Sequence, residues 1–245
     1  NVYYPSSTGG LYRSTDPEGN NPTVLFASIK KDGGQCIPHH PAANWGLVSA
    51  ATDWDYHDPE VQRVVEIFSR HADYEKFENQ SKYTKNIMKF ERHCAQDALA
   101  RGYHLGFIAG SDSHQIEHGI EGGILGAFVP TLTSENVWNA IYNRFTYGTS
   151  GARILASLKI GSHHMGEEIM IPAGEAVKLD VSVLAVNEIR KVQIIKNNEV
   201  LVEKENCGQA VDFTLEDGEE DFYYLRVEQI DDHCAWCSPI WVTRG

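Results

Sequence analysis

The sequence contains no uninterrupted apolar run of about 18 residues or more, which is the length that a membrane-spanning helix requires. Its first residues, NVYYPSSTGG, contain no methionine. They also show no charged segment followed by an apolar one, the pattern of a secretion signal. We therefore expect a chain that does not enter the membrane and that begins inside a longer protein.

Basic residues are scarce relative to acidic ones. The chain carries 21 lysines and arginines against 34 aspartates and glutamates, a formal net charge of -13. Such a charge repels both a nucleic-acid backbone and an anionic membrane surface, so neither is expected as a partner. A small anionic substrate remains compatible, because bound metal ions can reverse the local field.

Cysteine is sparse and widely spaced. The five cysteines are Cys36, Cys94, Cys207, Cys234 and Cys237, and their odd number does not favour a disulfide framework. The last two form a CxxC pair, but no second pair supplies the two further ligands of a structural zinc site. The pair also lies in a strand-like segment, AWCSPIWV, which favours packing over a redox or metal role.

Segments typical of strands and helices alternate over residues 23–147. Apolar spacing together with glycine or capping residues predicts helices over three segments: TVLFASIKKDGG (23–34), KNIMKFERHCAQDALARGY (85–103) and TSENVWNAIYNRF (133–145). Strands are expected at QCIPHH, VVEIFS, LGFIAGSDSH and GGILGAFV. This alternation predicts an α/β arrangement with parallel strands.

From Arg153 onward the apolar residues recur with a period of two, as in half-buried strands. KVQIIK and EVLVEK flank Asn197 and Asn198, which is a hairpin signal. About seven short strands of this kind predict an antiparallel β-sandwich. We place the boundary near Gly151, which divides the chain into residues 1–151 and 152–245.

Histidines gather in one part of the chain, since eight of the 11 fall between residues 39 and 118. In GSDSH (110–114), Asp112 and His114 are two residues apart after an apolar run. On an extended strand two such side chains point to the same side. They are therefore predicted to act together, as metal ligands or as an acid/base pair.

Other ligand-type residues lie at the ends of the preceding expected strands. His39 and His40 end the first strand, and Glu66 lies in the next one. The carboxyl ends of parallel strands gather ligands at one edge of an α/β fold. Because hydrolytic metal ions are bound by mixed histidine and carboxylate sets, these positions predict a metal site.

As an ordered set, the motifs resemble the later part of a protein of the PHP (polymerase and histidinol phosphatase) superfamily. They are IPHHPA, VEIFS, LGFIAGSDSHQ, LTSENVWNAIYNRFTYGTSGARI and the final AWCSPIWV. The resemblance extends from about residue 24 to the end, and is strongest to a bacterial family that appends a β-sandwich. It implies the C-terminal part of a distorted (β/α)7 barrel over 1–151, followed by an antiparallel sandwich over 152–245.

The resemblance also implies a chemistry. His40, Asp112 and His114 would bind metal, His39 would be an alternative ligand or a hydrogen-bond donor, and Glu66 would be either a ligand or structural. Members carry two or three ions such as manganese, iron or zinc, with a bridging hydroxide that attacks phosphorus. The full-length protein is thus expected to be a metal-dependent, phosphoesterase-like hydrolase of a small anionic substrate, with no side-chain nucleophile.

Three further residues are candidates for substrate binding. Arg144 could contact an anionic group in bidentate fashion, with a structural role at a helix end or sheet edge as the alternative. His118 follows the GSDSH motif and alternatively belongs to a turn. His57 lies in the loop WDYHDPE, which could cover the site or simply be solvated.

One element of the superfamily pattern is missing, because residues 1–38 contain no histidine and hence no first-strand HxH motif. The missing ligands would come from an N-terminal portion of the same protein or from a homo-oligomer, so the chain alone is expected to be weakly active or inactive. The alternatives are an inactive scaffold whose sandwich binds a partner, and a hydrolase of a non-phosphate substrate. By the resemblance the protein is soluble and bacterial, in the cytoplasm or periplasm.

Overall fold

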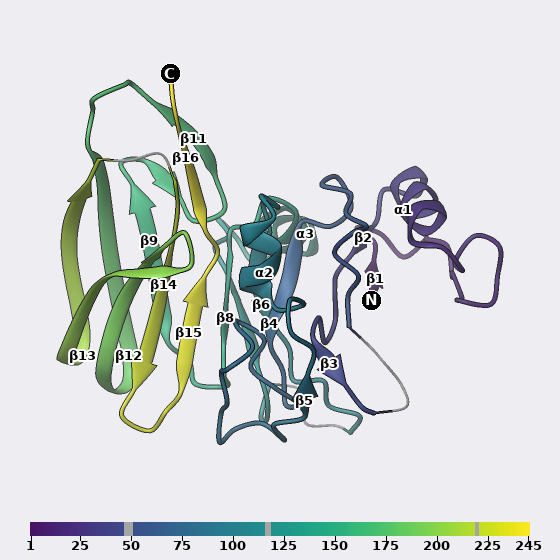
Figure 1. The fold of residues 1–245 in the computed structure, drawn as a ribbon, viewed down its shortest axis with the longest axis horizontal. Coiled ribbons are helices and arrows are strands. Elements are labelled where there is room, and N and C mark those ends of the chain that lie inside the picture. Colours follow the sequence, from purple (N-terminus) through teal and green to yellow (C-terminus); the bar gives the residue numbers. More distant parts are fainter. Residues whose placement is uncertain (47–50, 116–118, 219–220) are drawn as a thin grey trace.

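Strands dominate the structure, a computed structural model that describes residues 1–46, 51–115, 119–218 and 221–245 (Figure 1). The helices in these residues are short: α1 (Pro22–Lys31), α2 (Ala95–Ala100) and α3 (Ser134–Tyr142). None of them is long and apolar enough to cross a membrane.

The largest sheet is mainly antiparallel, and its strands run from teal through green to yellow in Figure 1. Within the described residues it has ten strands, of which seven follow the order β10-β9-β12-β14-β15-β8-β7. Strand β13 pairs with β12, and β16 pairs with both β14 and β11. The strands are β7 (Ile124–Ala127), β8 (Thr146–Thr149), β9 (Leu155–Ile160), β10 (His163–His164), β11 (Glu168–Ile171), β12 (Val177–Lys196), β13 (Glu199–Asp217), β14 (Asp221–Gln229), β15 (Cys234–Cys237) and β16 (Ile240–Arg244).

The expected period of two is confirmed in β12. Val177, Leu179 and Val181 are buried on one face, and the lysine between the first two is exposed. The expected hairpin is also confirmed, because Asn197 and Asn198 connect β12 to β13 with φ angles of 48° and 68°. Positive φ at both central residues is what a tight hairpin turn demands, and asparagine tolerates it better than most residues.

Three small two-stranded sheets make up the rest. In the first two, β1 (Val2–Tyr3) pairs antiparallel with β2 (Gln35–Cys36), and β3 (Ala43–Asn44) with β5 (Met88–Lys89). In the third, β4 (Val64–Phe68) pairs in parallel with β6 (Gly106–Ala109), and α2 lies between them in the chain.

The expectation of a partial (β/α)7 barrel over residues 1–151 is wrong. Within the described residues, β4–α2–β6 is the one parallel unit in this range, because β2 pairs antiparallel with β1. β7 pairs antiparallel with β8, and β8 continues into the large sheet through β15. Through that pairing the large sheet includes strands from both sides of residue 151, where we placed the boundary. The physical reason for the error is that alternation along the chain does not determine which strands pair.

Helix α3 begins where expected, with the Thr133 side chain accepting a hydrogen bond from the Asn136 amide. The helix expected over residues 85–103 shortens to α2. The first part of the segment 85–103 is not helical. Met88–Lys89 pairs with β3 instead, and the Lys89 ammonium donates to three backbone carbonyls at 2.7–2.8 Å. Long-range pairing thus overrides local helical spacing there.

Two cores lie on either side of the large sheet. One fills the sandwich with residues such as Leu158 and Val192. The other joins β4 and β6 to strands of the sheet through the buried aromatic residues Phe107, Tyr224 and Trp236. This second core fixes the parallel pair, and hence the ends of β4 and β6, against the sheet.

Candidate metal centre

Ligand-type side chains converge at the carboxyl ends of β4 and β6. His39 and His40 lie in the loop between β2 and β3, and Glu66 lies within β4. His71 follows β4 and Asp112 follows β6. His39, Glu66 and Asp112 also line a pocket of about 610 Å³. Glu66 and Asp112 thus come from the parallel pair, whereas His39 and His40 follow β2, which belongs to another sheet, and no barrel surrounds the place in the described residues.

Four imidazoles surround the carboxylate of Asp112. Its oxygens lie 2.6 Å from Nε2 of His71, 3.1 Å from Nε2 of His40, 3.4 Å from Nε2 of His39 and 3.5 Å from Nε2 of His114. Asp112 is in the left-handed region, with φ of 46°, and therefore belongs to a loop rather than to an extended strand. It meets His114 through that turn, so the expected proximity occurs by a different backbone path.

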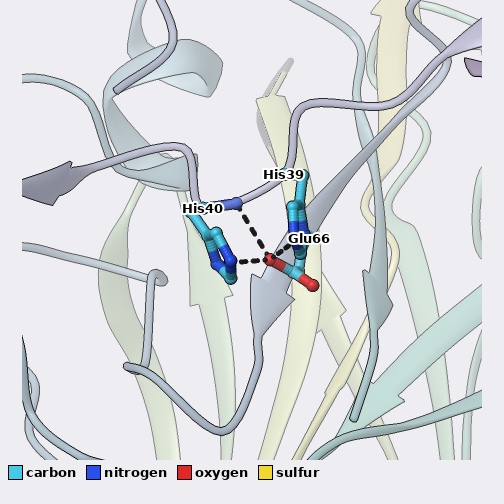
Figure 2. Close-up of side chains that lie close together, drawn as sticks. All are labelled: His39, His40 and Glu66. Carbon is cyan, nitrogen blue, oxygen red and sulfur yellow. Dashed lines mark hydrogen bonds and ion pairs between the residues drawn. The ribbon is translucent and has the colours of Figure 1, made fainter. Parts of the chain in front are cut away.

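Glu66 contacts the two adjacent histidines (Figure 2) through the nitrogens that do not face Asp112. Its Oε2 lies 3.0 Å from Nδ1 of His39 and accepts a hydrogen bond of 2.9 Å from the backbone N–H of His40. The same oxygen is 3.3 Å from Nδ1 of His40. Both imidazoles thus present Nδ1 to Glu66 and Nε2 to Asp112. A carboxylate behind a histidine is the common arrangement that orients the ligand nitrogen in metal sites.

The directions of the pKa shifts of Glu66 and His39 agree with an ionised Glu66. Burial tends to raise the pKa of the Glu66 carboxyl, but hydrogen bonds from His39 and His40 outweigh it and hold the pKa below its usual range. For His39, burial tends to lower the pKa, while the hydrogen bond and charge of Glu66 raise it above the ordinary value. The carboxylate is therefore held as an anion that attracts the Nδ1 protons of its neighbours.

Further contacts hold the ring of His40, which is buried with a φ of 54°. The Tyr74 hydroxyl lies 3.2 Å and the Ser69 hydroxyl 3.5 Å from its Nδ1. The ring packs 3.6 Å from that of His39, measured between centroids, and edge-on against Trp45. A left-handed conformation is unusual for a histidine, so the surrounding contacts must hold it in place.

The donor atoms fit a divalent metal ion. His40, His71 and Asp112 each offer one ligand atom within 4.8 Å of the others, as do His39, His40 and Glu66. Oδ2 of Asp112 is buried, with Nε2 of His71 and of His40 at 2.6 and 3.1 Å, and Nδ1 of His71 is buried without a hydrogen-bond partner in the described residues. A buried carboxylate is costly unless a cation compensates its charge. Mixed imidazole and carboxylate ligands suit zinc, iron or manganese.

We favour the set of His40, His71 and Asp112 as the ligands, because Oε2 of Glu66 is already occupied by the N–H of His40. His71 was missed in the sequence. The signal for it was its place directly after the buried strand VVEIF, in the segment SRHAD. Burial and the neighbouring charge of His40 lower the pKa of His71, which keeps it in the neutral form that binds metal.

The structure places the other expected site residues differently. His114 reaches Asp112 but its side chain is 84% exposed, at the rim. His57 stacks on Tyr103 and contacts Gln62, and it does not line the pocket beside the metal centre. His118 lies outside the described residues.

Arg144, expected to bind substrate, is buried where α3 meets the sheet. Its guanidinium donates to Glu168 and to the backbone carbonyl of Gly166, both at 2.8 Å, and lies over the ring of Trp241. It does not line the pocket beside the metal centre. These contacts support the structural role that was the alternative for Arg144.

Replacing Tyr74 with phenylalanine is expected to weaken metal binding about tenfold, the lower end of the effect of removing a group that orients a ligand. The hydroxyl contacts Nδ1 of His40, so its loss frees the ring to rotate. Zinc titration of the purified protein measures the change. Tyr103→Phe, which removes the hydroxyl of a half-buried tyrosine bonded to the Trp54 carbonyl, is the matched control. Equal affinities in both variants would contradict the orienting role.

Comparison with known proteins gives distant relatives. The chain is 30% identical over 227 residues to an uncharacterized protein of Chlamydia pneumoniae, which covers 78% of the chain and 36% of that protein. It is 28% identical over 220 residues to an uncharacterized protein of Chlamydia trachomatis, covering 75% and 35%. The chain thus spans about a third of the length of these relatives. No family model matches it.

Two solved structures show weak likeness. The sulfur carrier protein SoxY from Chlorobium limicola is 10% identical with a TM-score of 0.25, covering 37% of this chain and 78% of that one. A lytic polysaccharide monooxygenase from Jonesia denitrificans is 11% identical with a TM-score of 0.24, covering 60% and 93%. TM-scores this low do not establish a shared fold.

Proposed function

We propose that the protein is a metal-dependent hydrolase and that its substrate is a small phosphate ester. The observation that supports this most is the ring of four histidine Nε2 atoms around the Asp112 carboxylate, beside an open pocket. The choice of a phosphate ester rests on the ordered motifs that resemble the PHP superfamily, and hence on the sequence.

In this proposal each residue has a distinct task. His40, His71 and Asp112 hold the ion, and Glu66 orients His40 and His39 through their Nδ1 atoms. A divalent ion supplies a Lewis acid for the phosphoryl oxygen and lowers the pKa of water, so that no side-chain nucleophile is needed.

The pocket provides room for the rest of a substrate. From the metal centre it continues along apolar side chains that include Leu125, Trp138 and Ile141. In our proposal the anionic group of the substrate faces the histidines and its remainder lies against this wall, where burial of apolar surface contributes to binding.

The activity of the whole protein is also part of the proposal. Because the chain spans about a third of its relatives, we infer that residues outside it complete the metal centre. An N-terminal portion or a second copy of the chain would contribute further ligands for a second ion. The isolated chain is then expected to bind metal but to turn over slowly.

The test is metal-dependent turnover. Protein freed of metal and reloaded with manganese, iron or zinc is assayed on a phosphate monoester, a phosphate diester, an amide and a lactone, both as this chain and as a longer chain that includes the preceding residues. We expect phosphate ester hydrolysis that disappears on metal removal, returns on reloading and is absent from an Asp112→Asn preparation. Turnover of the amide or lactone alone would overturn the phosphate assignment. Metal binding without any turnover by the longer chain would overturn the hydrolase.

A further inference from the structure

We propose that a second pocket, next to the metal centre, binds an oxyanion such as phosphate. It has a volume of about 460 Å³ and combines residues from three distant segments of the chain. Arg70, Lys82 and Lys85 come from the loop after β4, Gly122 precedes β7, and His233 lies just before β15. We call it the oxyanion pocket. Its binding capacity does not depend on the proposed hydrolase activity.

Positive charge without a partner lines this pocket, although the protein is acidic overall. Across the described residues, neither Arg70 nor Lys85 makes an ion pair or a side-chain hydrogen bond, although the chain as a whole carries a net charge of -13. Lys82 is paired with Asp232 at 2.8 Å, and Glu121 is the carboxylate among the lining residues. Two free cations against one carboxylate leave the pocket positive. Such a pocket concentrates small anions, and an arginine offers them a bidentate contact.

A histidine ring that is held in place forms part of the pocket wall. The Ser150 hydroxyl accepts a hydrogen bond of 2.8 Å from the backbone N–H of Cys234 and lies 2.9 Å from Nδ1 of His233. Stacking on Tyr83, with a centroid distance of 3.6 Å, holds the ring. His233 thus presents a fixed imidazole, which can donate an N–H to an anion in the tautomer that carries its proton on Nε2.

Part of the pocket wall is backbone. Gly122 and Gly151 line the pocket with φ angles of 76° and 113°, a conformation that favours glycine. A Cβ atom at Gly122 would lie 2.7 Å from the Ser111 carbonyl oxygen, and one at Gly151 would lie 2.7 Å from the carbonyl oxygen of Gly122. The absence of side chains there lets the two loops pack closely together.

The oxyanion pocket and the metal centre share their dividing wall. Arg70 lines the pocket while the next residue, His71, contacts Asp112. Gly122 packs against Ser111, which precedes Asp112. An anion in the pocket is therefore close to the metal centre, either as a second acidic group of the substrate or as free phosphate.

Binding of inorganic phosphate to metal-free protein tests the proposal. Metal is removed by chelation and the chelator, itself a polyanion, is then removed by dialysis into chloride buffer before calorimetric titration. We expect one phosphate to bind per chain, and the Arg70→Gln/Lys85→Gln variant to bind it at least about tenfold more weakly, the effect of losing one charged hydrogen bond. The control, Arg13→Gln/Lys178→Gln, removes the same charges from exposed positions outside the pocket and should bind as the native chain does.

Failure of the native chain to bind phosphate, or equal affinity in the pocket variant, would overturn the proposal. Lys85→Glu provides a second check, since Lys85 is exposed and its reversal leaves the core intact; it too must weaken binding. Because the protein is metal-free, this result is independent of the hydrolase test. Kinetics of metal-loaded protein then identify the anion. If the pocket variant has a raised KM solely for esters that carry a second acidic group, the pocket binds that group of the substrate. If its KM is unchanged but phosphate no longer inhibits it, the pocket binds free phosphate.

Discussion

Replacing Asp112 with asparagine should remove the bound metal. The carboxylate is the shared neighbour of four histidine Nε2 atoms and has a buried oxygen, so both charge and a ligand atom are lost together. Removing a group that merely orients a ligand costs up to about 100-fold in metal affinity, so we expect at least about 100-fold here. Metal content by mass spectrometry and zinc titration measure it.

Asparagine has nearly the shape of aspartate, so the variant should stay folded, which circular dichroism can verify. Asp53→Asn is the matched control, because Asp53 is exposed and does not contact the metal centre. If Asp112→Asn retained the metal stoichiometry and affinity of the native chain, the assignment of the centre would be wrong.

Replacing Glu75 with alanine should destabilise the fold by about 3–5 kcal/mol, the range for breaking a buried ion pair. Glu75 is 0% exposed, and Nη1 of Arg226 donates to both of its carboxylate oxygens, at 2.8 and 2.9 Å. It also accepts hydrogen bonds from the Tyr224 hydroxyl and from Nε1 of Trp236. These contacts join the loop after β4 to the large sheet, and alanine would leave the guanidinium buried without its partner.

Urea denaturation measures the free energy of unfolding of this variant. Glu78→Ala, at an exposed position in the same loop, is the control and should change it by less than about 0.5 kcal/mol. A double variant, Glu75→Leu with Arg226→Met, should recover much of the loss because no charge is left buried. Equal stability of Glu75→Ala and the control would contradict a linking role for the carboxylate.

Local patterns in the sequence predicted individual elements well. The helix start at residues 133–134, the Asn197–Asn198 turn and the alternation in β12 depend on residues close together in the chain, and each is confirmed. The segment 85–103 was mispredicted because its apolar spacing suits a helix, whereas pairing with β3 and the carbonyls around Lys89 hold its first part as a strand.

The candidate site was predicted in part. His39, His40, Glu66 and Asp112 lie in or just after apolar runs of the sequence, so the sequence singled them out together. His71 lies in a loop whose path no local pattern specifies, and Arg144 was misassigned because a lone arginine carries no sign of its partners. Glu168, 24 residues later, is one of those partners.

By itself the sequence determined the short-range features of this protein: its acidic surface, its helix and hairpin signals, its sandwich strands, and the residue types able to bind a metal. Tertiary structure alone decided how the strands pair, that β8 joins the large sheet, and that four imidazoles face one carboxylate. The physical reason is the range of the interactions. Propensity, capping and periodicity act over a few residues, whereas strand pairing and ligand geometry depend on side chains brought together by burial of the core.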